Sequence, residues 1–395
     1  MNKIKKIAIF TGNRAEFGLL SPIIRSLIDV KKFDVKIIAS GSHLEKNFGS
    51  TIKEIKENGF KIYSQIKLNY PKDKKNTTPL AISDGAKQIS KVLFKLKPEL
   101  FIVYADRFEG FAAVIASTQM NIVTAHIEGG DLTQGGALDD SVRHAMSKLS
   151  HLHFTSNKSA KDRLIKLGEE KWRVFNVGFA AIDLFKKNTY ASSNEIIKKF
   201  KIDISKPIIL FTQHPITTNY TESEKEISPS LKALNKIAKL NYNIIITYPN
   251  NDIGSLKIIN KIKKIKNRKI KVYNSIGSFY YHGILNLNKL KIQKVVCVGN
   301  SSSGIKETPY FKCPTVNIGT RQDGRLRANN VIDVNYNANE IYMAIIRSIN
   351  DVSFQNKINK THNPYDGGNT GKNIANILKK LNFNIKKILN KQMTY

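Results

Sequence analysis

The chain alternates short apolar runs with longer amphipathic stretches. A short apolar run bounded by turn residues predicts a buried strand, whereas apolar positions three and four residues apart predict a helix. In the first half the patterns predict strands at 4–11, 35–40, 100–105, 122–127 and 153–156, and helices at 15–28, 44–58, 79–96, 110–119, 139–149 and 158–167. This alternation favours a parallel sheet with helices on both faces.

A second series of the same kind follows residues 183–194. It predicts strands at 207–212, 243–248, 270–273, 294–298 and 315–318, and helices at 228–240, 253–265, 303–308, 338–350 and 371–381. A length of 395 residues also favours two domains. We therefore predict an α/β protein with two Rossmann-like, doubly wound lobes, 1–185 and 186–370, and a cleft between them.

Composition narrows the functional classes. The formal net charge of +33 raises the question of nucleic-acid or membrane binding. The excess is mostly lysine spread along helices among isoleucine and asparagine, as in 257–271, and no zinc-finger spacing or aromatic-rich RNA-binding strand accompanies it. We therefore expect no nucleic-acid partner and no membrane partner. A positive field would still attract an anionic sugar nucleotide.

The chain carries no sequence signal for secretion or membrane insertion. The apolar run after the basic start is only 7–10, and no stretch approaches the ~20 apolar residues that span a bilayer. The two cysteines, Cys297 and Cys313, are too few for a disulfide framework and are expected as reduced core thiols. These features predict a cytoplasmic protein.

Polar clusters follow directly after many of the predicted strands. In open parallel sheets, ligands bind at the carboxyl ends of the strands. The clusters are Gly12-Asn13-Arg14, Asp106-Arg107, Glu128-Gly129-Gly130, Gln213-His214-Pro215, Pro249-Asn250-Asn251 and the loop GNSSSG at 299–304. Their shared position predicts one ligand site rather than scattered surface residues.

The densest acid/base group lies between 126 and 144, where HIEGGD precedes DDSVRH. Carboxylates in such a cluster can transfer protons, and neighbouring acids raise one another's pKa. We select Asp106, Glu128 and Asp139 as candidate acids and bases. Arg143 and His144, one helical turn after Asp139 and Asp140, could hold those two neighbouring acids in place. The alternative for Asp106 is a plain ion pair with Arg107.

The loop at 299–304, followed by a helix start, predicts an anion cradle. Ser301 and Ser302 would bind phosphate, and Glu307 would accept hydrogen bonds from ribose hydroxyls. An ordinary capped helix with a polar loop is the alternative reading.

Three cationic or titratable residues in the other loops suit the same anion. Arg14 and Arg321 could each bind the negative charge of phosphate. The alternative for Arg14 is an ordinary surface arginine, and the alternative for Arg321 is a solvated basic loop. His214, at a strand end, can donate to phosphate or act as an acid, although a lone histidine is often structural.

Taken together, these segments resemble a known family, the hydrolysing UDP-N-acetylglucosamine 2-epimerases of sialic- and legionaminic-acid-type synthesis. The resemblance covers 11–381. The matching motifs are TGNRAEFGLLSP, DRFE, HIEGGDLTQGGALDDSVRHAMSKLSHLHF, GNSSSGIKE, TRQDGR and NPYDGGNTGKNIANIL. The resemblance implies a GT-B fold whose final segment, 371–395, crosses back to the first lobe. GNSSSG distinguishes the chain from the non-hydrolysing epimerases.

The resemblance also implies an activity and a set of roles. The implied reaction converts UDP-N-acetylglucosamine, or a close relative such as UDP-N,N'-diacetylbacillosamine or a GDP-linked sugar, to the free 2-epimer through a glycal. Catalysis would fall to Asp106, Glu128, Asp139 and His214. Substrate binding would fall to Arg14, Arg107, Arg143, His144, Asn250, Ser301, Ser302, Glu307 and Arg321.

No nicotinamide is required, because no hydride is transferred, and magnesium is optional. We expect no resident metal, a UDP-sugar as the small-molecule partner, and a homodimer or homotetramer. A non-hydrolysing epimerase and a GT-B glycosyltransferase are the alternatives.

Overall fold

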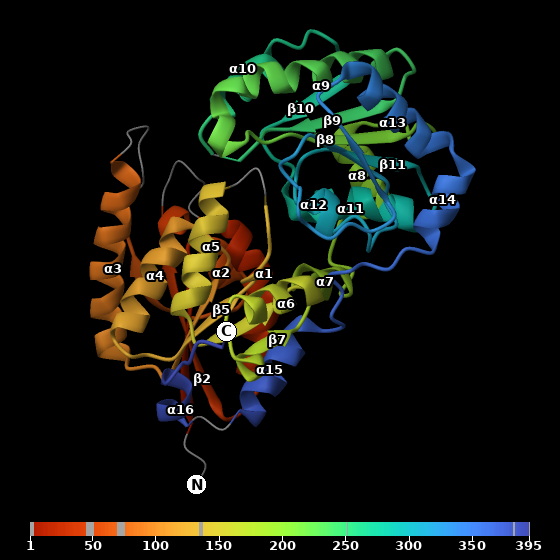
Figure 1. The fold of residues 1–395 in the computed structure, drawn as a ribbon. Coiled ribbons are helices and arrows are strands. Elements are labelled where there is room, and N and C mark those ends of the chain that lie inside the picture. The colour runs from red at the N-terminus through yellow and green to blue at the C-terminus, as the bar shows by residue number, and fades with distance from the viewer. Residues whose placement is uncertain are drawn as a thin grey trace. The chain divides into compact units, whose positions relative to one another are not determined.

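The computed structural model describes residues 4–44, 51–68, 76–133, 137–250, 252–381 and 384–394. It divides into two compact units (Figure 1). The first unit comprises Met1–Asp131, Asp139–Leu184 and Tyr365–Tyr395, and the second comprises Leu132–Leu138 and Phe185–Pro364. The chain thus changes units at Phe185 and returns at Tyr365, whereas the sequence placed the return at 371. A short segment before Asp139 also belongs to the second unit.

The first unit is built on a parallel sheet, whose order among the described residues is β3-β2-β1-β4-β5-β6-β7. Its inner strands, such as β4 and β5, are buried along their whole length, which explains why their sequences are continuous apolar runs. The strands are β1 (Lys5–Thr11), β2 (Phe33–Ser40), β3 (Ile62–Ile66), β4 (Leu100–Tyr104), β5 (Thr124–Ile127), β6 (Leu152–Thr155) and β7 (Val174–Asn176).

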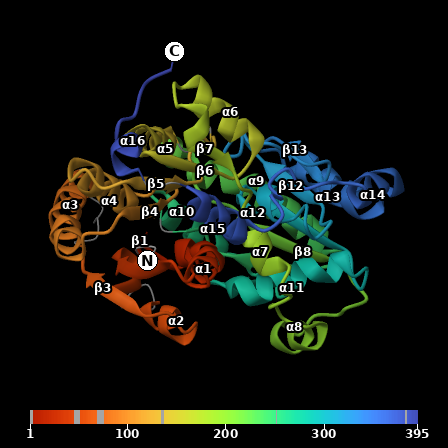
Figure 2. The same cartoon turned by 90° about the horizontal axis from the view of Figure 1, so that it is seen from below.

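Helices cover this sheet and bury two apolar clusters against it. The helices are α1 (Arg14–Ile28), α2 (Ile52–Glu57), α3 (Thr77–Leu96), α4 (Phe108–Gln119), α5 (Ala137–Leu149), α6 (Lys158–Lys166), α7 (Ala181–Phe185), α15 (Thr370–Lys380) and α16 (Ile385–Leu389). Helices α3 and α4 lie side by side, as do α1 and α15 (Figures 1 and 2).

The return of the chain to the first unit depends on a buried carboxylate. Both oxygens of Asp183 accept backbone N–H bonds from the start of α15, at Thr370 (2.9 Å) and Gly371 (2.8 Å). A Cβ on Gly371 would lie 2.6 Å from the carbonyl oxygen of Pro22 in α1, so glycine permits the two helices to touch. These contacts tie α15 to the first unit.

The second unit has its own parallel sheet and its own apolar core, with the described strand order β10-β9-β8-β11-β12-β13. The strands are β8 (Ile208–Thr212), β9 (Asn243–Thr247), β10 (Ile270–Tyr273), β11 (Val295–Gly299), β12 (Thr315–Ile318) and β13 (Val331–Val334). The helices are α8 (Ser193–Phe200), α9 (Ser223–Ala238), α10 (Ser255–Lys263), α11 (Gly277–Lys289), α12 (Ser303–Lys306), α13 (Ala338–Asn350) and α14 (Val352–Asn359).

Every predicted strand is confirmed, and the missed strands are β3, β7 and β13. All three lie at sheet edges, where partial exposure admits polar residues and breaks the apolar run. The sequence also missed the helices α7, α8, α11, α14 and α16. The predicted helix 44–58 is described only from Ile52, because 45–50 lie outside the described residues.

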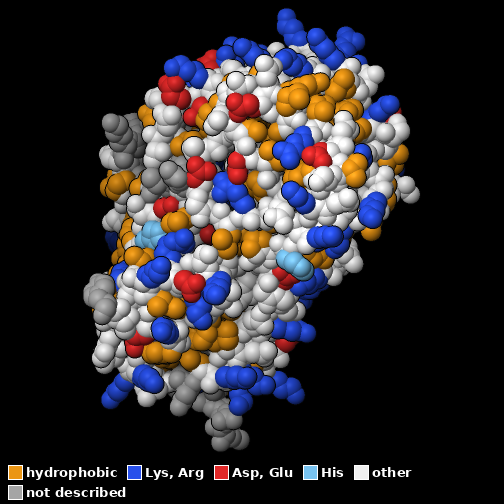
Figure 3. Space-filling model, turned by 45° about the vertical axis from the view of Figure 1, so that its right-hand side comes forward, with side chains coloured by type: hydrophobic (Ala, Val, Ile, Leu, Met, Phe, Trp, Pro, Cys, Tyr) orange, Lys and Arg blue, Asp and Glu red, His pale blue; other side chains and the backbone are white. Residues whose placement is uncertain are grey.

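The surface agrees with the interpretation of the basic composition. On the face shown in Figure 3, Lys and Arg side chains are scattered among other residues rather than gathered in one stripe. Cys297 and Cys313 are free and buried, as predicted. Within the described ranges, none of the helices combines the length and apolar content that crossing a membrane would require.

Candidate active site

The first unit brings several predicted residues together around the guanidinium of Arg143. This buried side chain on α5 forms ion pairs with Asp106, which follows β4, and with Asp140 at 2.5 Å. It also donates to the carbonyl oxygen of Asp131 at 3.0 Å. Asp139 lies in the first turn of the same helix. Arg143 therefore joins the β4 end, the β5 loop and α5; it pairs with Asp140, one of the two acids that the sequence assigned to it, and also with Asp106, which the sequence did not assign to it.

The backbone is unusual where β4 and β5 end. Ala105, just before Asp106, has φ of 58°, and Glu128 has φ of 65°. Residues with a side chain rarely adopt this left-handed conformation, which is worth about 1–3 kcal/mol of strain and clusters at functional sites. Thus Asp106 directly follows a strained residue at the end of β4, and Glu128 is itself a strained residue at the end of β5.

The carboxylate of Glu128 faces a buried tyrosine, Tyr104. Burial raises the pKa of Tyr104 well above its usual value, and the nearby charge of Glu128 raises it further. Glu16 and Asp131 add smaller effects of the same sign. Three carboxylates, two from the loop after β5 and one from α1, therefore act on one phenol at the carboxyl end of β4.

Two glutamates that the sequence analysis did not select are buried next to the loop after β1. The carboxylate of Glu16 accepts the backbone N–H of Gly12 at 2.7 Å, and a Cβ on Gly12 would lie 3.1 Å from that of Glu109. Burial, followed by the charge of Glu109, raises the pKa of Glu16 to about 7. The sequence shows Glu16 within the segment TGNRAEF, in the first turn of α1. A glutamate in a first helical turn is usually exposed, so the sequence did not indicate that this side chain is buried.

Three further predicted residues of this unit are Arg107, His144 and Arg14. Arg107 is partly exposed and forms an ion pair with Glu109 at 3.4 Å, whereas the sequence offered a pair with Asp106 as the alternative. The pKa of His144 is lowered by burial and by the charges of Arg143 and Arg163. Arg14 begins α1, and its side chain lies outside the described residues.

In the second unit, His214 and Asn250 contact each other, as their positions after neighbouring strands β8 and β9 predict. Nδ1 of His214 lies 3.1 Å from both the backbone nitrogen and the side-chain oxygen of Asn250. Burial and the charge of Arg321 lower the pKa of His214 to about 3. The imidazole is therefore neutral, and Asn250 holds it at Nδ1.

Asn300 links the three loops of this unit, and the sequence analysis did not select it. Its fully buried amide accepts the backbone N–H of His214 at 2.6 Å and donates to the His214 carbonyl at 2.9 Å. Its own carbonyl oxygen accepts from Arg321 (3.1 Å) and Gln322 (2.9 Å). The only sequence signal was an asparagine inside GNSSSG.

The serine loop is held from α11. The hydroxyls of Ser301 and Ser303 lie 3.0 Å apart, and Ser303 bonds the Tyr281 hydroxyl at 2.7 Å. Helix α12 after this loop ends at Lys306, earlier than predicted, so its dipole is short. Glu307 caps that helix, and its carboxylate pairs with His282 of α11 at 2.9 Å. The predicted anion cradle therefore depends more on loop hydroxyls and N–H groups than on a helix dipole.

The structure places seven predicted residues in the first unit and six in the second. Arg14, Asp106, Arg107, Glu128, Asp139, Arg143 and His144 belong to the first, and His214, Asn250, Ser301, Ser302, Glu307 and Arg321 belong to the second. In the part of the chain that the structure describes, no group of three His, Cys, Asp or Glu residues is arranged to hold a metal ion.

These two sheets, with acids after the strands of one and a hydroxyl-rich loop after a strand of the other, define a two-lobed Rossmann-like protein of the GT-B class. Residues 25–379 match the UDP-N-acetylglucosamine 2-epimerase family, and the chain belongs to that family. The predicted fold class and the predicted family are thereby confirmed.

Similar proteins fall in the same group. A GDP/UDP-N,N'-diacetylbacillosamine 2-epimerase (hydrolyzing) of Campylobacter jejuni is 38% identical, covering 84% of this chain and 85% of that protein. A UDP-N,N'-diacetylbacillosamine 2-epimerase (hydrolyzing) of Legionella pneumophila is 30% identical and covers 99% of this chain and 100% of that protein. The crystal structure of UDP-GlcNAc 2-epimerase from Neisseria meningitidis bound to UDP-GlcNAc has a TM-score of 0.80 at 20% identity, covering 95% of this chain and 100% of that one.

Proposed function

We propose that this protein is a hydrolysing sugar-nucleotide 2-epimerase. It would convert a UDP-linked N-acetylated hexosamine, such as UDP-N-acetylglucosamine or UDP-N,N'-diacetylbacillosamine, to the free 2-epimer and UDP. The observation that carries the proposal is a set of acids at neighbouring strand ends of the first unit: Asp106 pairs with Arg143 and Glu128 lies beside Tyr104, while Asp139 is in the first turn of the helix that carries Arg143. The names of the Campylobacter and Legionella relatives support both the hydrolysing reaction and an N-acetylated sugar.

The first chemical step is an elimination. A carboxylate removes the proton from carbon 2 of the sugar, the bond between carbon 1 and the diphosphate oxygen breaks, and a glycal with a double bond between carbons 1 and 2 remains. Asp106 and Glu128 are the candidates for this base. General-base catalysis of this type typically contributes ~10²–10⁴-fold to the rate.

The leaving diphosphate needs donors that are already in place. In the proposal, His214 donates through Nε2 and Arg321 supplies a positive charge. Ser301 and Ser302 supply hydroxyl and N–H donors, and Arg14 adds a second guanidinium. Glu307 accepts from the ribose, and its pairing with His282 fixes the orientation of the carboxylate. Asn250 holds the His214 ring through its contacts with Nδ1.

The second step is addition of water to the glycal. One carboxyl group takes a proton from water as the oxygen bonds to carbon 1, and another returns a proton to the opposite face of carbon 2. Asp139 is proposed for this step together with Glu128 or Asp106. Arg107 and His144 bind the sugar. No hydride moves, so no nicotinamide takes part, and magnesium is not required.

The product, a free 2-acetamido sugar of the N-acetylmannosamine type, suits the synthesis of sialic-type acids and surface polysaccharide. Proton NMR of reactions in D₂O with a panel of nucleotide sugars tests the proposal. We expect UDP and a free sugar with deuterium at carbon 2, and an unchanged rate after treatment with EDTA.

Two outcomes of that experiment would contradict the proposal. A 2-epimer that remains attached to UDP would identify a non-hydrolysing epimerase. Turnover that needs a sugar acceptor, with no deuterium at carbon 2, would identify a glycosyltransferase of the same fold.

A further inference from the structure

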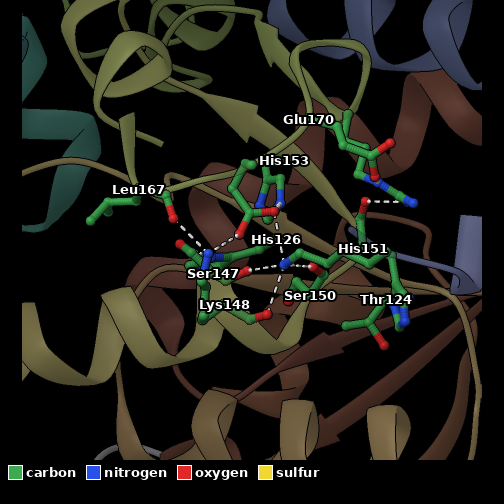
Figure 4. Close-up of polar contacts among 12 residues, drawn as sticks. Thr124, His126, Ser147, Lys148, Ser150, His151, His153, Leu167 and Glu170 are labelled. Atoms are coloured by element: carbon green, nitrogen blue, oxygen red, sulfur yellow. Dashed lines mark hydrogen bonds and ion pairs between the residues drawn. The ribbon is translucent and has the colours of Figure 1, made fainter. Parts of the chain in front are cut away.

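His126 lies inside the first unit, between the sheet and α5, and has no role in the reaction proposed above. It is the third residue of β5, two positions before Glu128, and its side chain is fully buried. Figure 4 shows it beside Ser147 and near two further histidines, His151 and His153. A buried histidine at this place invites the question of what its two ring nitrogens do.

Each ring nitrogen of His126 has a partner from a different element. Nε2 lies 2.6 Å from the carbonyl oxygen of Ala105, and Nδ1 lies 3.0 Å from the hydroxyl of Ser147. A carbonyl oxygen only accepts, so Nε2 carries the hydrogen and Nδ1 is left to accept from Ser147. The ring thus connects the end of β4 to helix α5.

Both partners lead directly to predicted catalytic groups. Ala105 is the strained residue before Asp106, and its N–H also bonds the carbonyl of Ile127, next to Glu128. Ser147 lies one turn after Arg143 on α5, and its hydroxyl is 3.0 Å from the Arg143 carbonyl oxygen; because its single hydrogen goes to His126 Nδ1, this second approach is a contact and not a further hydrogen bond. A single imidazole therefore contacts the backbone beside Asp106 and the helix that carries Arg143.

The glycine after Glu128 fits the same arrangement. A Cβ on Gly129 would lie 2.6 Å from the Ser147 hydroxyl and 2.9 Å from His126 Nδ1. Any side chain there would break the bond between these two residues, so the first glycine of HIEGG is explained by His126 and Ser147. The segment HIEGG therefore has two roles: it carries Glu128, and its Gly129 leaves room for the contact between His126 and Ser147.

The surroundings of the ring keep it uncharged. Burial lowers the pKa of His126 to about 3, although the bond to the Ala105 carbonyl acts in the opposite direction. The titratable groups near it are His153 on β6, His144 on α5 and Lys391 in the C-terminal segment, and each lowers the pKa further. The ring therefore stays neutral at any pH at which the enzyme would work.

We propose that His126 is a positioning residue for the reaction, holding the Asp106 turn and helix α5 in register through Ala105 and Ser147 without transferring a proton itself. The inference rests on the proposed function, because it assigns His126 a role in the placement of those carboxylates. A displacement of ~1 Å in such groups can lower a rate ~10²-fold.

Two substitutions at this position separate the two contacts. In His126→Gln, the amide nitrogen takes the place of Nε2 and can still donate to Ala105. In His126→Asn, the amide reaches only the Nδ1 side, toward Ser147. We expect kcat to fall roughly 100-fold in His126→Asn and roughly 10-fold in His126→Gln, with UDP affinity little changed, because the proposed nucleotide residues other than Arg14 lie in the other unit.

His151→Asn is the matched control. His151 is also buried, lies between α5 and β6, and accepts the backbone N–H of Thr124 at its Nδ1 at 3.1 Å. Asn keeps an oxygen for that N–H but removes the buried ring, so the variant should lower the melting temperature of the protein without changing kcat per folded enzyme. An equal loss of kcat in His151→Asn would reduce the effect at His126 to general destabilisation and overturn the inference.

The pH profile and NMR complete the test. We expect the shape of kcat against pH to be the same in His126→Asn and the natural chain, at a lower height. Loss of one limb of the profile would instead make His126 an acid or base. In ¹⁵N spectra of the natural chain, a neutral Nε2–H imidazole is expected from about pH 5 to 9, and a charged or Nδ1–H ring would overturn the inference.

The spectrum does not depend on turnover, so the two proposals fail separately. A chain that epimerises no nucleotide sugar, with the Nε2–H ring in place, would contradict the function and leave the contact standing. A turnover-competent chain with a charged His126 ring would contradict only this inference.

Discussion

The candidate site residues of the two units differ in the type of side chain. In the first unit the groups are ionisable and largely buried: Arg143 pairs with Asp106 and Asp140, and Glu16 lies beside Glu109. Strained backbone occurs here at Ala105, before Asp106, and at Glu128. In the second unit, loops are held by neutral amides and hydroxyls, chiefly those of Asn300 and Ser303. Under the proposed function, the first set moves protons and the second binds a diphosphate.

This difference has a physical basis. A group that exchanges protons near neutral pH needs a pKa shifted by burial or by like charge, and both conditions cost stability. A group that binds an anion needs fixed donors and no titration, because pre-oriented dipoles need no rearrangement when the anion arrives. Substitutions should therefore affect proton transfer in one unit and nucleotide affinity in the other.

The largest expected effect is at Glu128. Glu128→Gln should lower kcat by roughly 10³-fold, because the amide keeps the shape of the side chain and loses the ability to take a proton. UDP affinity, measured by calorimetry, should stay within about 2-fold, a change well under 1 kcal/mol. If UDP binding were lost with turnover, Glu128 would belong to substrate holding and the contrast between the units would fail.

The next effect concerns stability and tests the charged character of the first unit. The pKa of Glu16 is raised to about 7, above the usual 4.5, mainly by burial and then by Glu109. A raised folded-state pKa means that the stabilising contribution is present below the unfolded value and is lost as pH rises through 7. The shift corresponds to about 3 kcal/mol of stability between those limits.

Glu16→Gln should remove that loss while keeping an oxygen for the N–H of Gly12. Denaturant unfolding of both chains at several pH values is the measurement. We expect the natural chain to lose stability between about pH 4.5 and 7 relative to the variant. Parallel curves for the two chains would show that Glu16 is ionised throughout and would contradict the assignment.

Asn300→Ala probes the neutral loops of the second unit. Removal of the amide leaves the N–H and carbonyl of His214 unpaired, at a cost of about 1–3 kcal/mol. UDP affinity should fall roughly 10–100-fold, whereas deuterium incorporation per bound substrate should change little. Asn330→Ala is the control, because that buried amide bonds Thr308 and Cys313 in the same unit. An equal affinity loss in the control would reduce the Asn300 result to destabilisation.

The smallest effect is expected at Arg321, whose guanidinium is partly exposed and bonds the Asn300 carbonyl. Arg321→Ala should weaken UDP binding by roughly 10-fold at low salt, and by less at high salt because ions screen the charge. Fluorescence or calorimetric titration at two salt concentrations measures it. An affinity that does not change at either concentration removes Arg321 from the nucleotide site.

Local patterns in the sequence were enough for the alternation of strands and helices and for the polar clusters after the strands. Inner parallel strands are buried on both faces, so their sequences become apolar runs that can be recognised without any neighbour. The same reasoning located Asp106, Glu128 and His214 at strand ends, because each of them comes shortly after the end of an apolar run that forms a strand. The edge strands β3, β7 and β13 escaped it, since half-exposed positions lack the apolar signal.

The contacts within each unit were decided by the tertiary structure. Arg143 meets Asp106 from 37 positions away because β4 and β5 are neighbours in the sheet and α5 follows β5. Asn300 reaches His214 across 86 positions because β8 and β11 are paired. Burial of Glu16 beside Glu109 and the neutral ring of His126 depend on the same packing. A residue's type states what chemistry it can perform, but its charge, partners and strain depend on residues that only folding brings near.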